Sequence, residues 1–166
     1  MTLYFLRHAL ALDRARWRQK DSERPLTPEG IRKMRKAARG LKRLKLKLDW
    51  ILTSPYKRAY DTARIVADTL KAGKKLKIAK DLASSGDPKR LLRHLALDYR
   101  TKDSLMVVGH EPYLSRLVSV LIGAEKPIAL DFKKGGLCRL DADSLHYGRC
   151  ATLEWWLPPK LLKTIK

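Results

Sequence analysis

The stretch Ser104-Leu105-Met106-Val107-Val108-Gly109-His110 decides the fold class of this chain. Its four consecutive apolar residues predict a strand that is buried on both faces, as the strands of parallel sheets are. Gly109 and His110 then lie at the carboxyl end of that strand. Because such a sheet needs helices on both of its faces, the stretch indicates an α/β protein.

The rest of the chain alternates strands with helices. Further strands are predicted at residues 2–6, 49–53, 76–79, 137–140 and 151–157. Helices are predicted to open at Thr27-Pro28, after Ser54-Pro55, at Asp87-Pro88 and at Pro112, since proline is favoured in the first turn of a helix. Residues 9–27 are predicted to form a long loop. This order predicts a three-layer α/β/α sandwich with a mostly parallel central sheet, in a single domain over residues 1–166.

Composition excludes several classes of protein. The 166 residues include 37 Lys and Arg against 17 Asp and Glu, a formal net charge of +20. No apolar stretch approaches the ~20 residues that span a bilayer, and Arg7 interrupts the apolar start of the chain where a signal peptide would continue. Cys138 and Cys150 are too few for a disulfide scaffold and lack the spacing of zinc ligands. We therefore expect a cytoplasmic protein without a membrane partner.

The positive charge is concentrated in one run. Arg32 to Lys47 contains nine basic residues and no acidic one, and apolar residues recur within it at three- and four-residue steps from Ile31 to Leu44. This spacing predicts a helix with an apolar stripe and a cationic outer face. Two interpretations stay open: a solvated helix face, or a landing surface for a polyanion. No aromatic residue is interleaved, so nucleic-acid binding by base stacking is poorly supported, although the basic surface does not exclude it.

Three segments that are distant in the sequence are predicted to meet at one crevice. Ligands of open α/β sheets bind beyond the carboxyl ends of the strands, where Arg7-His8, Ser54 to Arg58 and Gly109-His110 are expected. Guanidinium groups match phosphate oxygens, and an imidazole can attack phosphorus. Two arginines and two histidines, without a cluster of carboxylates for Mg²⁺, suit phosphoryl transfer through a phosphohistidine without a metal or another cofactor.

Four motifs at these positions resemble a known family, the histidine phosphatase superfamily with its phosphoglycerate mutase-like fold. They are Leu6-Arg7-His8-Ala9, Leu26-Thr27-Pro28-Glu29-Gly30, Ser54-Pro55-Tyr56-Lys57-Arg58-Ala59 with Thr62-Ala63, and Val108-Gly109-His110-Glu111-Pro112. The short chain, the Arg24-Pro25-Leu26-Thr27 stretch and the His-Glu-Pro turn are similar to the SixA-like branch, the protein phosphohistidine phosphatases. The resemblance covers residues 2–157. Ala9 replaces the glycine that is commonest after the first histidine.

The resemblance implies a role for each of these side chains. His8 is the nucleophile that becomes phosphorylated, Arg7 and Arg58 grip the phosphoryl oxygens, and His110 donates a hydrogen bond to them. Arg24 lines the mouth of the pocket or joins the phosphate contacts. Two alternatives remain open: Ser54 either contributes its hydroxyl or caps the following helix, and Arg58 either binds phosphate or pairs with Asp61.

The sequence differs from many members of the family in the residue that would protonate the leaving group. Many of its phosphatases use a Glu or Asp after the second helix, but this chain has no Glu between Glu29 and Glu111. Asp81 is the possible general acid, since Asp87 is better explained as the cap of the helix that begins at Pro88. A protonated imidazole, with a pKa of ~6.5, leaves as a neutral group, whereas an alkoxide does not. A pocket without a strong general acid is therefore better suited to the cleavage of a P–N bond than to the cleavage of an alkyl phosphate ester.

Three functions follow from these residues. The first is a metal-independent phosphatase that removes phosphate from phosphohistidine in proteins. The second is a phosphatase of the same mechanism acting on a small polyanionic phosphate or a nucleotide, which the net charge supports because a cationic rim attracts anions. The third is a non-catalytic module that binds phosphate or nucleic acid.

Overall fold

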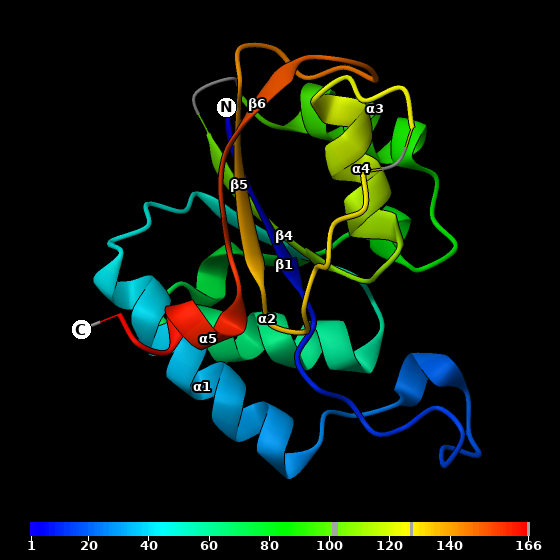
Figure 1. The fold of residues 1–166 in the computed structure, drawn as a ribbon, viewed down its shortest axis with the longest axis vertical. Coiled ribbons are helices and arrows are strands. Elements are labelled where there is room, and N and C mark those ends of the chain that lie inside the picture. Colours follow the sequence, from blue (N-terminus) through cyan, green and yellow to red (C-terminus); the bar gives the residue numbers. More distant parts are fainter. Residues whose placement is uncertain (101–102, 127, 166) are drawn as a thin grey trace.

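The fold is a six-stranded mixed sheet covered by helices on both faces, as predicted (Figure 1). The structure, a computed structural model, describes residues 1–100, 103–126 and 128–165. The strands lie in the order β3-β2-β4-β1-β5-β6. They comprise β1 (Thr2–Arg7), β2 (Trp50–Thr53), β3 (Leu76–Ile78), β4 (Ser104–Gly109), β5 (Leu137–Ala142) and β6 (Ala151–Leu157). Parallel pairs join β1, β2, β3 and β4, while β5 pairs antiparallel with both β1 and β6.

Two groups of helices cover the sheet (Figure 1). The helices α1 (Pro28–Arg43), α2 (Lys57–Thr69) and α5 (Pro159–Leu162) pack on one face, and α3 (Pro88–Asp98) and α4 (Tyr113–Leu121) pack on the other. Alternate residues of β1 serve the two cores: Tyr4 and Leu6 face α1 and α2, whereas Leu3 and Phe5 face α3 and α4. Among the described residues, none of these helices is long and apolar enough to cross a membrane.

The helix α1 begins where its sequence predicts and ends within the basic run. Thr27 caps it, because its Oγ1 accepts a hydrogen bond from the N–H of Gly30 at 2.9 Å, and Pro28 occupies the first turn. The helix ends at Arg43, however, and Lys45 adopts a left-handed backbone with φ of 52°. Lys45 and Lys47 of the basic run therefore lie beyond the helix.

The segment 9–27 is more ordered than a plain loop. Ala11 and Leu26 form an antiparallel bridge, and Asp21–Glu23 form a turn of 3₁₀ helix, η1. The indole N–H of Trp17 donates to the carbonyl oxygen of Lys20 at 2.9 Å. The segment is a long loop, as predicted, and it contains two ordered features that the sequence did not indicate. The turn η1 forms through local bonds, whereas the bridge joins residues that are distant along the segment.

Candidate active site

Backbone hydrogen bonds hold three strand ends together at one edge of the sheet. The N–H of His8, just after β1, donates to the carbonyl oxygen of Gly109 at 3.0 Å, and the N–H of Ser54, just after β2, donates to that of Val108 at 3.0 Å. The parallel register of β1, β2 and β4 thereby brings His8, Ser54 and His110 to one place. Sequence reasoning predicted this convergence, and the structure shows it.

His8 is buried and its ring has a defined orientation. The side chain is 6% exposed, and its Nδ1 donates a hydrogen bond to the carbonyl oxygen of Ala9 at 2.7 Å. The proton of the neutral ring therefore sits on Nδ1, and Nε2 carries a free lone pair. Burial, together with the nearby His110, Arg58 and Arg7, lowers the pKa of His8 to about 3. At neutral pH the ring is an uncharged base.

Ser54 connects His110 to the start of α2. The Oγ of Ser54 accepts a hydrogen bond from the N–H of Tyr56 at 3.2 Å and lies 2.8 Å from Nε2 of His110. Tyr56, and not Ser54, occupies the N-cap position of α2, which leaves the other alternative for Ser54, a hydroxyl that takes part in the site. The rings of His8 and His110 have centroids 5.2 Å apart. Burial and the charge of Arg58 lower the pKa of His110 to about 3, so its ring is neutral in the free site.

The ring of Tyr56 forms a wall of the site that sequence reasoning did not single out. It packs 5.1 Å from the His110 ring, and the guanidinium of Arg58 lies 5.0 Å from its centroid. These contacts restrict how His110 and Arg58 can turn.

Backbone carbonyls hold the two predicted phosphate-binding arginines, Arg7 and Arg58, and the Nε–H group of each side chain stays without a hydrogen-bond partner among the described residues. Nη1 of Arg7 donates to the carbonyl oxygen of Phe132 at 2.6 Å, and Nη1 of Arg58 donates to that of Asp21 at 2.8 Å. The Nε atoms of both side chains, and Nδ1 of His110, are buried without a hydrogen-bond partner among the described residues. Unpaired buried donors of this kind are suited to an anionic ligand with several oxygens.

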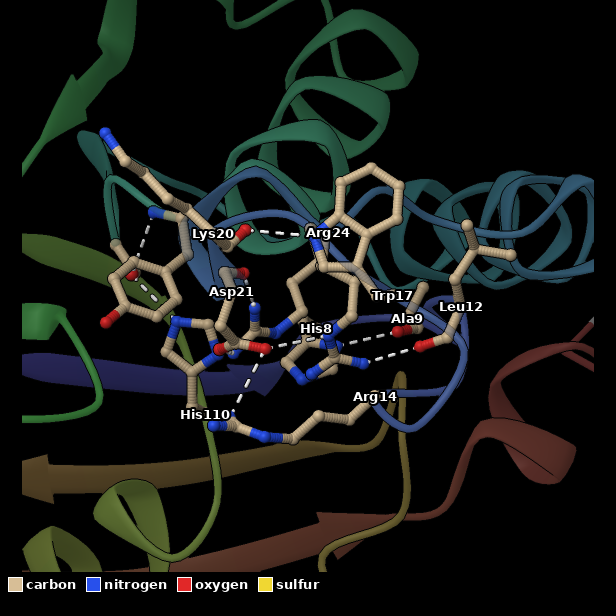
Figure 2. A network of polar contacts seen from close by, with 12 residues as sticks. His8, Ala9, Leu12, Arg14, Trp17, Lys20, Asp21, Arg24 and His110 are labelled. Carbon is tan, nitrogen blue, oxygen red and sulfur yellow. Dashed lines mark hydrogen bonds and ion pairs between the residues drawn. The ribbon is translucent and has the colours of Figure 1, made fainter.

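Asp21 is the part of the site that sequence reasoning missed. Its Oδ2 accepts from Nη2 of Arg58 at 3.0 Å, its Oδ1 accepts from Nε of Arg24 at 2.9 Å, and Arg14 lies 3.4 Å away. Figure 2 shows Asp21 between Arg24 and His110, with Arg14 reaching it from the other side. Arg58 therefore does not pair with Asp61, which binds Lys57 at 3.2 Å instead. The spacing of Asp21 three residues before Arg24 was the available sequence signal.

Arg24 lies at the site, as expected, and is fixed by two contacts. Besides Asp21, its Nη1 donates to the carbonyl oxygen of Leu12 at 2.6 Å. A further cation, Lys134, lies near the site. Burial and the charges of Arg7 and Arg24 lower the pKa of its ammonium group, which indicates that the three cations are close together. No pattern around Lys134 pointed to this position, because it belongs to the turn that precedes β5.

Asp81, the possible general acid, has both carboxylate oxygens engaged. It is 8% exposed, Oδ1 accepts from Nε of Arg90, and Oδ2 lies 2.7 Å from Nδ1 of His94. Its hydrogen bonds thus go to α3, and none of them goes to His8, Arg7, Arg58 or His110. Glu111, next to His110, accepts from the N–H of Ser115 at 3.0 Å in the first turn of α4.

The arrangement combines a neutral imidazole that has a free lone pair with the two guanidinium groups of Arg7 and Arg58 near it. Such a set can attack a phosphorus atom and stabilise the charge on its oxygens. Within the described residues, no three His, Cys, Asp or Glu side chains are grouped so that they could hold a metal ion.

Comparison with known proteins agrees with this geometry. The model of the histidine phosphatase superfamily, branch 1, matches residues 3–84. The phosphohistidine phosphatase SixA of Escherichia coli strain K12 is 31% identical over 168 residues, which cover 100% of this chain and 99% of SixA. An uncharacterized protein of Picosynechococcus is 35% identical over 141 residues, 84% of each chain.

The similarity extends to solved structures. A structure of the protein histidine phosphatase SixA complexed with tungstate superposes with a TM-score of 0.82 at 29% identity, covering 98% of this chain and 99% of that one. The three-layer fold is thus phosphoglycerate mutase-like, as expected. Since the sequence relationship spans the chain and the motif residues meet in one site, this phosphatase belongs to the histidine phosphatase superfamily, in its SixA-like branch.

Proposed function

We propose that this phosphatase hydrolyses phosphohistidine in proteins and that His8 carries the phosphoryl group during the reaction. The observation that carries the proposal is the orientation of His8. Its Nδ1–H bond to Ala9 at 2.7 Å leaves Nε2 as the nucleophile, and its pKa of about 3 keeps that nitrogen unprotonated at neutral pH. The 166 residues act as one domain in this proposal.

The reaction proceeds in two steps. Nε2 of His8 attacks phosphorus while the P–N bond of the substrate breaks, and the substrate histidine, protonated on its other ring nitrogen, leaves as neutral imidazole. Water then attacks the phosphoryl group on His8, giving inorganic phosphate and free His8. Arg7 and Arg58 bind the phosphoryl oxygens in both steps, and Arg24 contributes positive charge at the mouth of the site.

His110 donates to the phosphoryl group through Nδ1. The Oγ of Ser54 already accepts from Tyr56, so its own hydrogen is free to donate to Nε2 of His110. That bond places the proton of the neutral ring on Nδ1, which has no partner among the described residues. Binding of a dianion also raises the pKa of His110, because the negative charge favours the protonated ring.

The engaged carboxylates support a phosphoramidate substrate. Asp81 is bound by Arg90 and His94, and the pKa of Asp21 is held low by its hydrogen bond from Arg24 and the charge of Arg58, despite a partial burial that acts in the opposite direction. Neither is placed as a strong acid for an alkoxide leaving group. The similarity to a protein named phosphohistidine phosphatase supports the same substrate class.

A second candidate is hydrolysis of small polyanionic phosphates or nucleotides by the same mechanism. Lys134 and Arg14 near the site, and a net charge of +20, favour such anions. A non-catalytic phosphate-binding or nucleic-acid-binding module is disfavoured by the buried, oriented lone pair of His8.

The test is a comparison of a histidine-phosphorylated peptide with nucleotides, inositol phosphates and an aryl phosphate. We expect the highest kcat/KM for the peptide, no effect of EDTA, and an acid-labile phosphoryl adduct on His8 after rapid quenching. His8→Ala should abolish turnover and the adduct. A label on any other residue would contradict the mechanism, and faster turnover of nucleotides would contradict the substrate.

A further inference from the structure

The outer surface of α1 and α2 forms a long basic groove. The two helices lie side by side (Figure 1), and the groove between them encloses about 1100 Å³. Six cations line it, and we call it the α1–α2 groove: Arg35, Arg39, Lys42, Arg43, Lys57 and Arg64, with Asp61 and Asp68 as the acidic members. Ile31 and Ile65 form a half-buried apolar floor.

Most of these cations have no role in holding the fold. Lys57 pairs with Asp61 at 3.2 Å, and Nη1 of Arg43 donates to the carbonyl oxygen of Ile165 at 2.9 Å. Arg35, Arg39, Lys42 and Arg64 are exposed and form no salt bridge within the described part of the chain. An anionic partner that lies in the groove would relieve the mutual repulsion of these four cations.

The spacing of the cations matches an acidic helix. Arg35, Arg39 and Arg43 follow one another every four residues on α1, a rise of about 6 Å each time. Carboxylates at every fourth position of a partner helix have the same repeat. The apolar floor suits the apolar stripe that such a helix carries, as in other helix-in-groove complexes.

A nucleic acid fits the groove less well. No aromatic residue is found among its described lining residues, so bases have no surface on which to stack. Asp61 and Asp68 would repel a continuous phosphodiester backbone, whereas a protein helix can place its own basic or neutral side chains opposite them.

The groove begins beside the active site. Lys57 and Arg58 are consecutive in the first turn of α2, with Lys57 in the groove and Arg58 bound to Asp21 in the site. We infer that the α1–α2 groove docks an acidic helix of the protein whose phosphohistidine the active site hydrolyses. The inference rests on the proposed function and assigns to the groove the selection of the protein substrate.

The test uses charge reversal with a matched control. In the groove variant, Arg35, Arg39 and Arg64 become Glu; in the control, Arg93, Arg100 and Arg116, which are exposed on the α3 and α4 side, become Glu. The probe is a fluorescein-labelled helical peptide with Glu at every fourth position and one histidine, and a second peptide has Gln at the same positions. A second groove variant has Gln at the same three positions, which removes the positive charge without adding negative charge that could disturb folding.

Binding of the unphosphorylated peptides, measured by fluorescence anisotropy, tests docking without hydrolysis. We expect the Glu peptide to bind wild type at least 10-fold more tightly than the Gln peptide, and the groove variants to lose this preference, which rising salt also weakens. The control should keep it within about 3-fold. Equal losses in groove and control variants would overturn the inference, as would tighter binding of a 20-nucleotide single-stranded RNA than of the Glu peptide.

Kinetics then separate docking from the proposed function. With the phosphorylated Glu peptide, the groove variant should raise KM about 10-fold without changing kcat, and hydrolysis of para-nitrophenyl phosphate should be unchanged. If the groove variant raises KM equally for the phosphorylated Glu peptide and the phosphorylated Gln peptide, the docking inference is overturned. If the peptides bind as expected but are not hydrolysed, the proposed function fails and the groove must serve another acidic protein, which overturns the inference as stated.

Discussion

Asp21 holds the guanidinium of Arg58 with two different oxygen atoms. Its carboxylate Oδ2 accepts from Nη2 at 3.0 Å, and its backbone carbonyl accepts from Nη1 at 2.8 Å. Arg58 is thereby fixed in the site before substrate arrives. The carboxylate also competes with a phosphoryl group for the same guanidinium.

Asp21→Asn removes this competing charge and keeps the shape of the side chain. We expect tungstate or inorganic phosphate to bind about 10-fold more tightly, because a negative charge beside the bound dianion is lost. Isothermal titration at low salt measures the affinity. Weaker binding in the variant would mean that the charge of Asp21 serves chiefly to position Arg58.

Thr62 couples the loop after β1 to α2. Its Oγ1 accepts from the N–H of Ala9 at 3.0 Å and donates to the carbonyl oxygen of Arg58 at 2.7 Å. Thr62→Val should lower kcat 10- to 100-fold and destabilise the fold by about 1–3 kcal/mol, since the buried N–H of Ala9 loses its acceptor. Urea unfolding and steady-state kinetics check both effects. Thr62→Ser keeps the hydroxyl and should restore most of kcat.

Ser54→Ala tests the orientation of His110. Without the hydroxyl, Nε2 of His110 loses its partner at 2.8 Å, and the ring is free to carry its proton on either nitrogen. We expect kcat to fall about 10-fold with little change in KM. An NMR spectrum of the ring nitrogens should show a mixed tautomer in the variant, and an unchanged tautomer would contradict the assignment.

Asp81→Asn should leave hydrolysis of a phosphohistidine peptide within about 3-fold of wild type. Both oxygens of Asp81 are bound by Arg90 and His94, and the leaving imidazole needs no added proton. The measurement is kcat with the peptide and with an alkyl phosphate. A fall of ~100-fold on the peptide would identify Asp81 as a general acid.

The two site histidines make stability depend on pH. The pKa values of His8 and His110 are lowered from 6.5 to about 3 in the folded protein, so the unfolded chain binds more protons between these values. Stability present at neutral pH is therefore lost as pH falls below 6.5, by up to about 1.4 kcal/mol per pH unit for each histidine. Urea unfolding between pH 7 and pH 4 should show this slope, and His8→Gln should reduce it. An equal slope in the variant would mean that other groups cause it.

Local sequence patterns sufficed for most of the fold. The apolar run before Gly109, the Thr27-Pro28 cap and Asp87-Pro88 each specify structure through neighbouring residues alone, and each was placed correctly. The sequence has no clear signal for the end of α1, because basic and apolar residues continue to alternate after Leu44. The helix ends at Arg43, and Lys45 has a left-handed backbone. A short C-terminal helix, α5, was not predicted. It packs against α1 where Gly40 has no side chain, since a Cβ there would lie 1.8 Å from the carbonyl oxygen of Leu162.

The positions of the motif residues were predictable where they lie at a strand end or in the helix that directly follows one. Arg7, His8 and His110 lie at or just after the ends of β1 and β4. Arg58 lies in the first turn of α2. The positions of Asp21 and Lys134 were not predictable in this way, because each lies in a turn whose path depends on distant contacts. The turn of Asp21 depends on the bridge of Ala11 to Leu26. The turn of Lys134 depends on the bond from the N–H of Gly135 to the carbonyl oxygen of Arg7.

The buried donors on Arg7, Arg58 and His110 that have no partner among the described residues should affect the melting temperature of the protein. An unpaired buried polar group lowers the free energy of unfolding. Replacing Arg58 with methionine should yield an inactive protein with a higher melting temperature. A tetrahedral oxyanion should raise the melting temperature of wild type, and do so less in that inactive protein. If both melting temperatures change in this way, selection for heat tolerance alone would favour variants that have lost the phosphate site.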